Sequence, residues 1–186
     1  MPRTPIQYQL MKDERKLSIL ESALPLFAIH GKDSVSIDMI CKKAQCSHGL
    51  FYHYFKNSEQ IYNELLKAEN CVSIQSNLIP FEDDENALPQ LVEVSKKLLS
   101  YISGDKTVVS FALLVISDTS KNYFIEEITK LISRGQKEGS VTGGTPSEIA
   151  SVYILFFKGL FLTYLNEKHP SIRMPSIDNI VQIFER

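Results

Sequence analysis

The sequence predicts an all-α protein, with an N-terminal three-helix domain that contains a helix-turn-helix and a C-terminal helical domain. Apolar residues recur at helical spacing over long segments, as Leu17, Leu20, Leu24 and Phe27 do near the N-terminus. Glycine and proline separate such segments, and no run shows sustained alternation of apolar and polar residues bounded by hairpin turns. We therefore expect about nine helices.

The first helix is expected to end at His30, because Gly31 stands where a glycine commonly closes a helix. Pro25 lies inside the same helical pattern. A proline there removes one backbone hydrogen bond and favours a bend.

Residues 36–60 predict two short helices joined by a tight turn, followed by the start of a third helix. Ser36 and Ser47 are residues of N-cap type, one before each of the short helices. Asn57 followed by Gln60 resembles a capping box at the third start. A helix-turn-helix of this kind places the N-terminal part of its second helix in the major groove of DNA.

The rest of the chain predicts further helices, which Pro80, an acidic run and glycine-containing linkers separate. The helix that starts near Asn57 is expected to continue to residue 78. The nearly all-apolar stretch 108–116 predicts a buried helix, although the same pattern fits a buried strand. The other expected helices cover residues 87–103, 123–137 and 147–167, with a short last helix after residue 175.

The helix expected at 147–167 is apolar on nearly every side. Such a helix must be buried on several faces. One core rarely covers all of them in a chain of 186 residues, so a second subunit is the expected cover. Gly159 would let two helices approach closely, and the alternative is a central helix in a monomeric bundle.

Charge is unevenly distributed along the chain. The formal net charge is −2, but residues 1–58 hold eight Lys or Arg against five Asp or Glu, a net charge of +3. The remaining residues hold twelve against seventeen, a net charge of −5. A mildly basic N-terminal part fits contact with nucleic acid, although ordinary variation of surface charge would give the same numbers.

The sequence predicts a cytoplasmic protein with no membrane partner. Residues 1–16 lack the apolar core of a signal peptide. The apolar stretch 152–165 is broken by Lys158, so no uninterrupted run approaches the length of a membrane span.

Neither a metal site nor an enzyme is expected. Cys41, Cys46 and Cys71 have no metal-type or redox-type spacing. Cys41 lies on an apolar helix face and is expected to be a small core residue, and a metal or redox site of Cys46 with His48 is the alternative. None of the four histidines lies in a metalloprotease or nucleophile motif. A helical module that binds protein partners is the stronger rival to a DNA-binding protein.

Residues from about 16 to 66 resemble the DNA-binding domain of TetR-family transcriptional regulators. The resemblance implies domains at 1–58, for DNA binding, and 59–186, for effector binding and dimerisation. It implies a ligand-responsive repressor that acts as a homodimer on a palindromic double-stranded DNA operator. No cofactor is expected, and the small-molecule effector is unidentified. The residues that carry the resemblance are Leu20, Ala23, Phe27, Gly31, Ser36, Ile37, Ile40, Ala44, Ser47, Gly49, Leu50, Tyr52, Phe55 and Glu59.

The second helix of the motif is expected to read DNA. The resemblance implies that its two histidines face bases and that two tyrosines and Ser36 contact phosphates, while Lys56 adds charge. A tyrosine packed in the core, or a solvated His48, is the alternative for each. The expected DNA-binding residues are Ser36, Ser47, His48, Gly49, Tyr52, His53, Tyr54 and Lys56.

Two positions depart from the family pattern. Gln45 stands where the turn usually has glycine, so either this residue adopts a positive φ at a cost of about 1 kcal/mol or the turn has a different geometry. Ser58 stands where the family usually has a lysine that contacts phosphate, and Lys42, Lys43 and Lys56 are expected to compensate.

The C-terminal domain carries two further sets of candidate residues. Phe111, Tyr153 and Phe157 are candidates for an effector pocket, with plain core packing as the alternative. An effector would shift the two recognition helices away from the spacing of about 34–36 Å that DNA requires. The resemblance implies that the last two helices form the dimer interface, and the expected interface residues are Tyr153, Phe156, Gly159, Leu160, Ile180 and Phe184.

Overall fold

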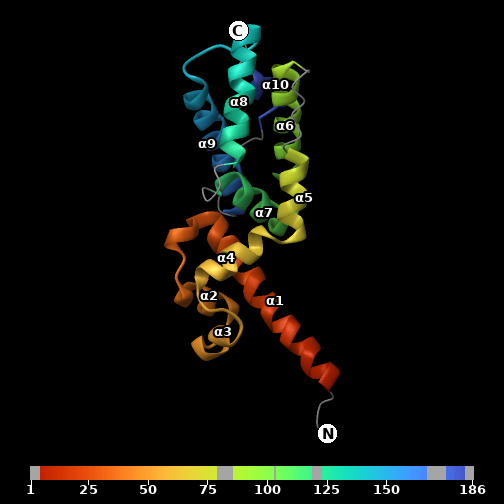
Figure 1. Cartoon of the computed structure of the whole chain (residues 1–186), viewed down its shortest axis with the longest axis vertical. Helices are drawn as coiled ribbons and strands as arrows, with labels where there is room; N and C mark the ends of the chain where they lie inside the picture. Colours follow the sequence, from red (N-terminus) through yellow and green to blue (C-terminus); the bar gives the residue numbers. More distant parts are fainter. Residues whose placement is uncertain (1–4, 79–85, 103, 119–122, 167–174, 183–186) are drawn as a thin grey trace. The chain divides into compact units, whose positions relative to one another are not determined.

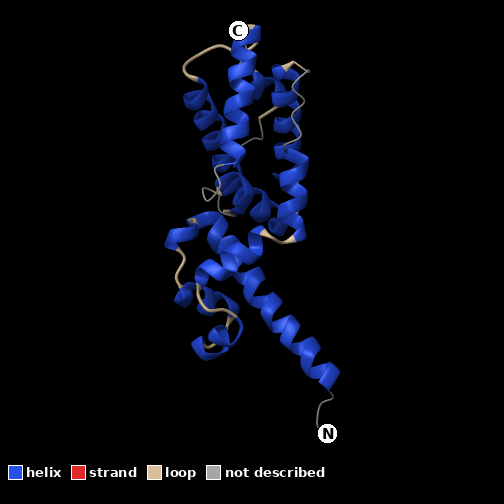
Figure 2. Cartoon of the chain, in the orientation of Figure 1, coloured by secondary structure: helices blue, strands red, loops and turns tan. Residues whose placement is uncertain are grey.

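The computed structural model describes residues 5–78, 86–102, 104–118, 123–166 and 175–182 of the chain. These residues form ten α-helices and a short 3-10 helix at Lys32–Ser34, and they contain no strand, which confirms the all-α prediction (Figures 1 and 2). The helices are α1 (Pro5–His30), α2 (Ile37–Ala44), α3 (His48–Tyr54), α4 (Ser58–Leu66), α5 (Glu69–Leu78), α6 (Ala87–Ile102), α7 (Lys106–Ser117), α8 (Tyr123–Glu138), α9 (Pro146–Leu165) and α10 (Ile177–Val181).

The chain divides into two compact units, which we call the head (Met1–Ala68) and the body (Glu69–Arg186). The expected boundary after Ser58 would have cut α4 from the head. Because α4 packs against α1, the division falls after Ala68 instead.

The single helix expected over 57–78 is two helices in the structure. α4 ends with i→i−3 hydrogen bonds, from the N–H of Lys67 to the Glu64 carbonyl at 3.2 Å and from the N–H of Ala68 to the Leu65 carbonyl at 3.1 Å. Such bonds tighten the last turn of a helix and leave the i→i−4 ladder unfinished. A new helix, α5, then begins at Glu69.

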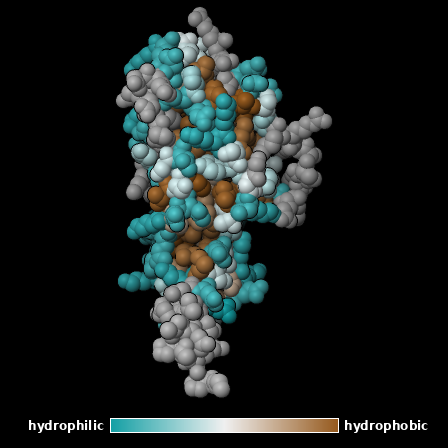
Figure 3. Space-filling model, turned by 90° about the vertical axis from the view of Figure 1, so that its right-hand side faces the viewer, coloured by the Kyte–Doolittle hydropathy of each residue, from teal (hydrophilic) through white to brown (hydrophobic). Residues whose placement is uncertain are grey.

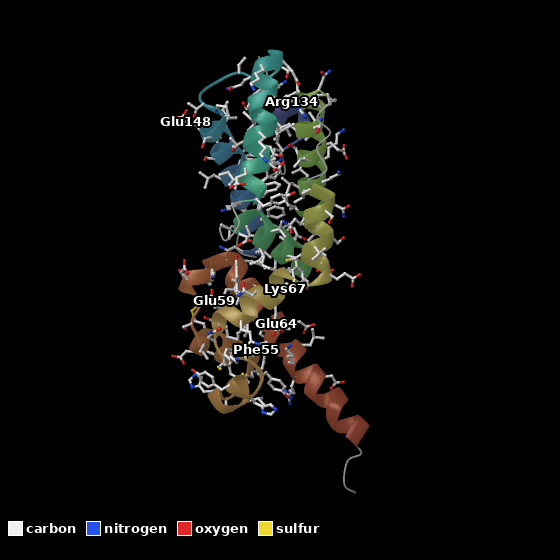
Figure 4. The ribbon with its side chains drawn as sticks, viewed as in Figure 1. Phe55, Glu59, Glu64, Lys67, Arg134 and Glu148 are labelled. Atoms are coloured by element: carbon white, nitrogen blue, oxygen red, sulfur yellow. The ribbon has the colours of Figure 1, made fainter. Side chains whose placement is uncertain are left out.

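An aromatic core holds the head together. Phe27 of α1 packs edge-on against Tyr62 of α4, with ring centroids 5.3 Å apart, and α1 continues through Pro25 to His30. Lys16 ties α1 to the same core, because its Nζ lies 2.6 Å from Glu64 Oε2 and 5.5 Å from the centre of the Phe55 ring (Figure 4). This core supports the two short helices of the motif.

The body is built around α7, which contacts α5, α6, α8 and α9. All residues from Val109 to Ile116 are buried. The carboxylate of Asp105 caps the helix, accepting hydrogen bonds from Thr107 N at 2.8 Å and Val108 N at 3.0 Å. The apolar stretch 108–116 is therefore a buried helix and not a strand.

The capping box of Thr145 and Glu148 starts α9, the long apolar helix. Among the described residues, α9 is the one helix long and apolar enough to cross a membrane by length and composition. The prediction from the sequence relied on unbroken apolar runs. Because Lys158 interrupts the apolar run in this helix, the prediction did not identify it as long and apolar enough. Its inner face packs against α7 and α8, as in the core helix of a bundle. On the face of the molecule that Figure 3 shows, apolar patches lie among hydrophilic side chains.

Gly135 allows α8 and the segment after it to meet closely. Val141 N and Ser140 N both donate to the Gly135 carbonyl, and a Cβ added at Gly135 would lie 2.6 Å from Val141 Cγ2. We expect Gly135→Ala to lower the free energy of unfolding by about 1–3 kcal/mol through overpacking, as measured by urea denaturation. In a Val141→Ala background the same change should cost less, and equal costs in both backgrounds would contradict this account.

Candidate nucleic-acid interface

Both short helices of the motif begin as the sequence predicts. Ser36 Oγ accepts a hydrogen bond from Met39 N, and Ser47 Oγ accepts one from Leu50 N, each at 3.2 Å. A hydroxyl that accepts in this way keeps its own O–H as a donor. Since both serines are exposed, each places one donor at the N-terminus of a helix, where an anion is favoured.

The turn between the helices contains a strained residue. Gln45 has φ 50° and ψ 47°, in the left-handed region, so the first of the two expected alternatives is confirmed. Among the described residues it is the one non-glycine with a positive φ. Left-handed backbone costs a residue with a Cβ roughly 1–2 kcal/mol.

We expect Gln45→Gly to raise the free energy of unfolding by up to about 1 kcal/mol, because glycine adopts this conformation without the Cβ penalty but loses more backbone freedom on folding. Gln45→Ala keeps the Cβ and is the matched control, which should show no such gain. Thermal unfolding of both variants measures the difference. A gain in the alanine variant as large as that in the glycine variant would show that strain is not the cause.

α3 has a buried side and an exposed side. Phe51 and Phe55, the residue that directly follows the helix, are 0% and 1% exposed, respectively, and pack in the head core. Tyr52 is 58% exposed, so it is not a core aromatic. Gly49 and His53 are exposed as well. The side of α3 that faces solvent thus carries residues that the sequence assigned to DNA.

Tyr54 differs from Tyr52 in being half-buried. Its ring lies edge-on to that of His53, with centroids 4.9 Å apart, and is tilted against Phe55 at 6.5 Å. The packing restricts the direction in which the Tyr54 hydroxyl can point. Lys56, which follows at the edge of the motif, is exposed, and its N–H donates to Gln60 Oε1 at 2.8 Å.

A side-chain contact that the sequence analysis missed joins the two helices. His48 Nε2, at the start of α3, lies 2.6 Å from Asp38 Oδ1 in the first turn of α2. His48 is therefore held by a partner and is not simply solvated. While Nε2–H donates to Asp38, Nδ1 is the ring nitrogen left to meet a base, as an acceptor in the neutral ring or a donor in the charged one. Only the relative placement of α2 and α3 reveals this pair.

Three lysines are expected to compensate for the family lysine that Ser58 replaces. Lys42 and Lys43, in the last turn of α2, and Lys56 are all exposed. Lys32 instead forms a salt bridge with Glu59, with its Nζ 2.7 Å from Glu59 Oε1. That hydrogen bond and the charge of Lys32 lower the pKa of the Glu59 carboxyl below its usual value.

Comparison with known proteins indicates the family to which the head belongs. The family model of bacterial regulatory proteins of the tetR family matches residues 19–65. These residues contain the whole helix-turn-helix. The chain belongs to the TetR family. It is thus a DNA-binding transcriptional regulator with a helix-turn-helix.

Similar proteins match this TetR-family regulator over different lengths. The uncharacterized HTH-type transcriptional regulator YhgD of Bacillus subtilis is 21% identical over 184 residues, which is 94% of this chain and 96% of the relative. The Tn10 TetC protein of Escherichia coli is 34% identical over 85 residues, 46% of this chain and 43% of that protein. The crystal structure of apo AibR has a TM-score of 0.60 at 17% identity and covers 92% of this chain and 98% of its own. The AibR likeness concerns the fold.

The effector-pocket candidates of this TetR-family regulator lie in the core of the body. Phe111 is 7% exposed, and Tyr153 and Phe157 are 0% exposed. The Tyr153 hydroxyl and Ser95 Oγ are hydrogen-bonded at 2.9 Å, and the Tyr153 and Phe157 rings lie 4.9 Å apart. In this state the three residues pack as core residues, so an effector would have to open that core. Their role in a pocket stays a prediction.

A groove that the sequence did not predict lies between α8 and the start of α9. Its volume is about 830 Å³. Lys130, Arg134 and Lys137 line it from α8, with Thr145 and Ser147 from the start of α9. Two of these cations have acidic neighbours: Lys130 Nζ lies 2.7 Å from Glu127 Oε1, and Arg134 Nε lies 3.7 Å from Glu138 Oε1.

The expected dimer-interface residues of this regulator fall on different sides of their helices. Tyr153 and Ile180 are 0% and 1% exposed within their own chain, so neither side chain can meet a partner directly, contrary to expectation. Phe156 and Leu160 are half-buried and Gly159 is exposed, whereas Phe184 lies outside the described residues.

The solvent-exposed side of α9 carries apolar residues that the expectation did not single out. Val152 is 53% exposed, Leu155 66% and Leu162 37%. With Phe156 and Gly159 they recur at helical spacing, so they share one side of α9, which we call the α9 face. Exposed apolar residues that gather on one side of a helix are typical of an interaction site.

Proposed function

We propose that this TetR-family regulator represses transcription by binding a palindromic operator as a homodimer, with α3 of each subunit as the recognition helix. The single observation that carries the proposal is the division of α3 into a buried side, Phe51 and Phe55, and an exposed side with His48, Tyr52 and His53. An exposed tyrosine and two exposed histidines on a capped helix start offer hydrogen bonds to phosphates and base edges.

Phosphate contacts would set the position of the head on DNA. The O–H donors of Ser36 and Ser47 stand at two helix N-termini, and Tyr52 offers a hydroxyl one turn into α3. Lys42 and Lys56 supply charge in place of the missing lysine at position 58. Phosphate contacts of this type bring affinity without sequence specificity.

Base contacts would come from the leading edge of α3. Gly49 has no side chain, which permits close approach to the groove, and a Cβ there would meet only Ser47 Oγ, at 3.9 Å. His48 and His53 flank this opening, and Tyr54 is placed beside His53. The histidines are the proposed readers of base edges.

The α9 face supports a homodimer. Burial of its apolar residues by a second copy of the chain would remove an exposed apolar surface and pair two helices around Gly159. Half-buried Phe156 and Leu160 would lie at the border of the contact. Two recognition helices in a dimer would meet two half-sites about 34–36 Å apart, which is why the operator is expected to be palindromic.

A small molecule is the proposed signal, and the body is its proposed receptor. A solved structure of AibR contains isovaleryl coenzyme A and operator DNA, and its fold matches this chain with a TM-score of 0.57 at 17% identity. The presence of an organic ligand in a protein of similar fold supports an organic effector for the body of this chain, but does not identify that effector. Release from DNA requires the effector to bind the DNA-incompetent conformation more tightly. Such a regulator would act in the cytoplasm.

Gel-shift titration with the DNA upstream of the protein's own gene tests the function. Retention that is sequence-specific and falls steeply with salt is the expected result. A helical module for protein partners would give no retention even at low salt, and that outcome would overturn the proposal.

His48→Ala should weaken operator binding by about 5- to 150-fold, because one good base contact contributes about 1–3 kcal/mol. Binding to unrelated DNA and the thermal unfolding temperature should change little, because the contact that His48 makes with Asp38 is exposed to solvent and such contacts contribute little to stability. His30→Ala removes an exposed histidine at the end of α1 and is the matched control. A similar loss in both variants would remove His48 from the base-reading role.

A further inference from the structure

Two cysteines meet at the turn of the helix-turn-helix. The N–H of Cys46 donates to the Cys41 carbonyl at 3.0 Å, across the left-handed residue Gln45. This is the 6→1 hydrogen bond of a Schellman motif, in which the first and sixth side chains commonly make an apolar contact. Here both residues are cysteines, so the motif places their two side chains next to each other. The turn therefore brings together two thiols that the sequence spacing did not suggest as a pair.

The two thiols differ in access and in chemistry. Cys41 is 6% exposed, and burial, followed by the hydrogen bond and charge interaction with Cys46 and the charge of Asp38, raises the pKa of its thiol to about 11. Cys46 is half-exposed. An oxidant from solution thus meets Cys46 first, with Cys41 directly behind it as a resolving thiol.

We propose that Cys41 and Cys46 form a reversible intramolecular disulfide that weakens operator binding. The oxidant is a low-molecular-weight disulfide of the glutathione type. The Cys46 thiolate attacks it, forming a mixed disulfide and releasing one glutathione thiolate. The Cys41 sulfur then loses its proton to solvent and attacks the Cys46 sulfur, releasing the second glutathione. Two protein thiols are oxidised, and one glutathione disulfide is reduced to two thiols.

The effect on DNA binding rests on the proposed function of α3. Cys46 directly precedes Ser47 and His48, the cap and first residue of the recognition helix. A disulfide brings two sulfurs to about 2.05 Å with a fixed dihedral angle, so Cys41 or the start of α3 must move from its place in the reduced turn. Because Cys41 is packed in the head core, the shift is expected to displace the donors of Ser47 and His48. We expect operator affinity to fall at least about 5-fold in the oxidised protein, as befits loss of one base contact.

Intact-mass analysis after incubation with oxidised glutathione, with free thiols blocked, tests the disulfide. Wild type should lose about 2 Da without a lasting adduct, and reduced glutathione should reverse the change. Cys71→Ser is the matched control and should behave like wild type, because Cys71 is 1% exposed and lies in the body. Cys41→Ala should stop at a glutathione adduct on Cys46, whereas Cys46→Ser should show neither product. A lasting adduct on Cys46 in wild type, a bond between subunits, or no reaction would overturn the disulfide.

Gel shifts on the same samples test the consequence. Oxidised wild type and Cys71→Ser should bind operator more weakly than their reduced forms, and Cys46→Ser should bind equally under both conditions. A disulfide that forms while binding stays unchanged would overturn the switch. If the disulfide forms but neither form binds the operator, the proposed function fails and the disulfide stands.

Discussion

Replacing Leu155 with arginine should convert the proposed dimer to a monomer and lower operator affinity at least about 100-fold, because each monomer keeps only one recognition helix. Leu155 is 66% exposed at the middle of the α9 face. In a symmetric dimer, the two-fold axis would pass through this face and bring the two new arginines near each other. Burying like charges without partners is strongly unfavourable. Sedimentation velocity measures the oligomeric state, and fluorescence anisotropy with labelled operator measures the affinity.

Val72→Arg is the matched control for Leu155→Arg. Val72 is 51% exposed on α5, away from the α9 face, so the same change in charge and size should leave the dimer intact. A Leu155→Arg protein that stays dimeric, or a Val72→Arg protein that dissociates, would show that the subunits meet elsewhere.

Phe51→Ala should lower the free energy of unfolding by about 3–5 kcal/mol, as removal of a buried aromatic side chain leaves a cavity. Phe51 is 0% exposed and its ring lies 5.9 Å from that of Phe55 and 5.5 Å from that of Tyr52. Chemical denaturation followed by circular dichroism measures the loss. Operator binding should fall with it, because α3 depends on Phe51 for its attachment to the head core.

The neighbouring substitution Tyr52→Ala separates stability from DNA contact. Tyr52 is 58% exposed, so its loss should change the free energy of unfolding far less than that of Phe51, while operator binding should still weaken. Equal destabilisation by the two substitutions would contradict the division of α3 into a buried and an exposed side.

The caps and the turn of the head could be predicted from the sequence because they depend on hydrogen bonds between residues close in the chain. Ser36 and Ser47 each bond a backbone N–H three residues ahead. Gln45 takes the left-handed conformation, which is one of the two alternatives that the sequence left open. The burial of the stretch in α7 could be predicted as well, because a nearly all-apolar stretch that is too short to span a membrane is typical of a core.

Contacts between helices could not be predicted in this way. The pairing of Asp38 with His48 depends on how the turn places α3 against α2. The meeting of Cys41 and Cys46 depends on the conformation of the turn itself, which the sequence left open. The break after α4 was also missed, because residues 57–78 keep a helical apolar pattern across it.

The sequence by itself determined that this protein is helical, that its N-terminal part contains a helix-turn-helix, and that one of its last helices is apolar on nearly every side. Local capping and apolar periodicity are sufficient for these conclusions. Only the tertiary structure decided which side of α9 is buried. Tyr153 and Phe157 point inward and Leu155 outward, because α7 and α8 cover one side of α9. In a helix that is apolar on nearly every side, no sequence pattern distinguishes the side that will be buried. The helices that pack against it decide which side faces the core.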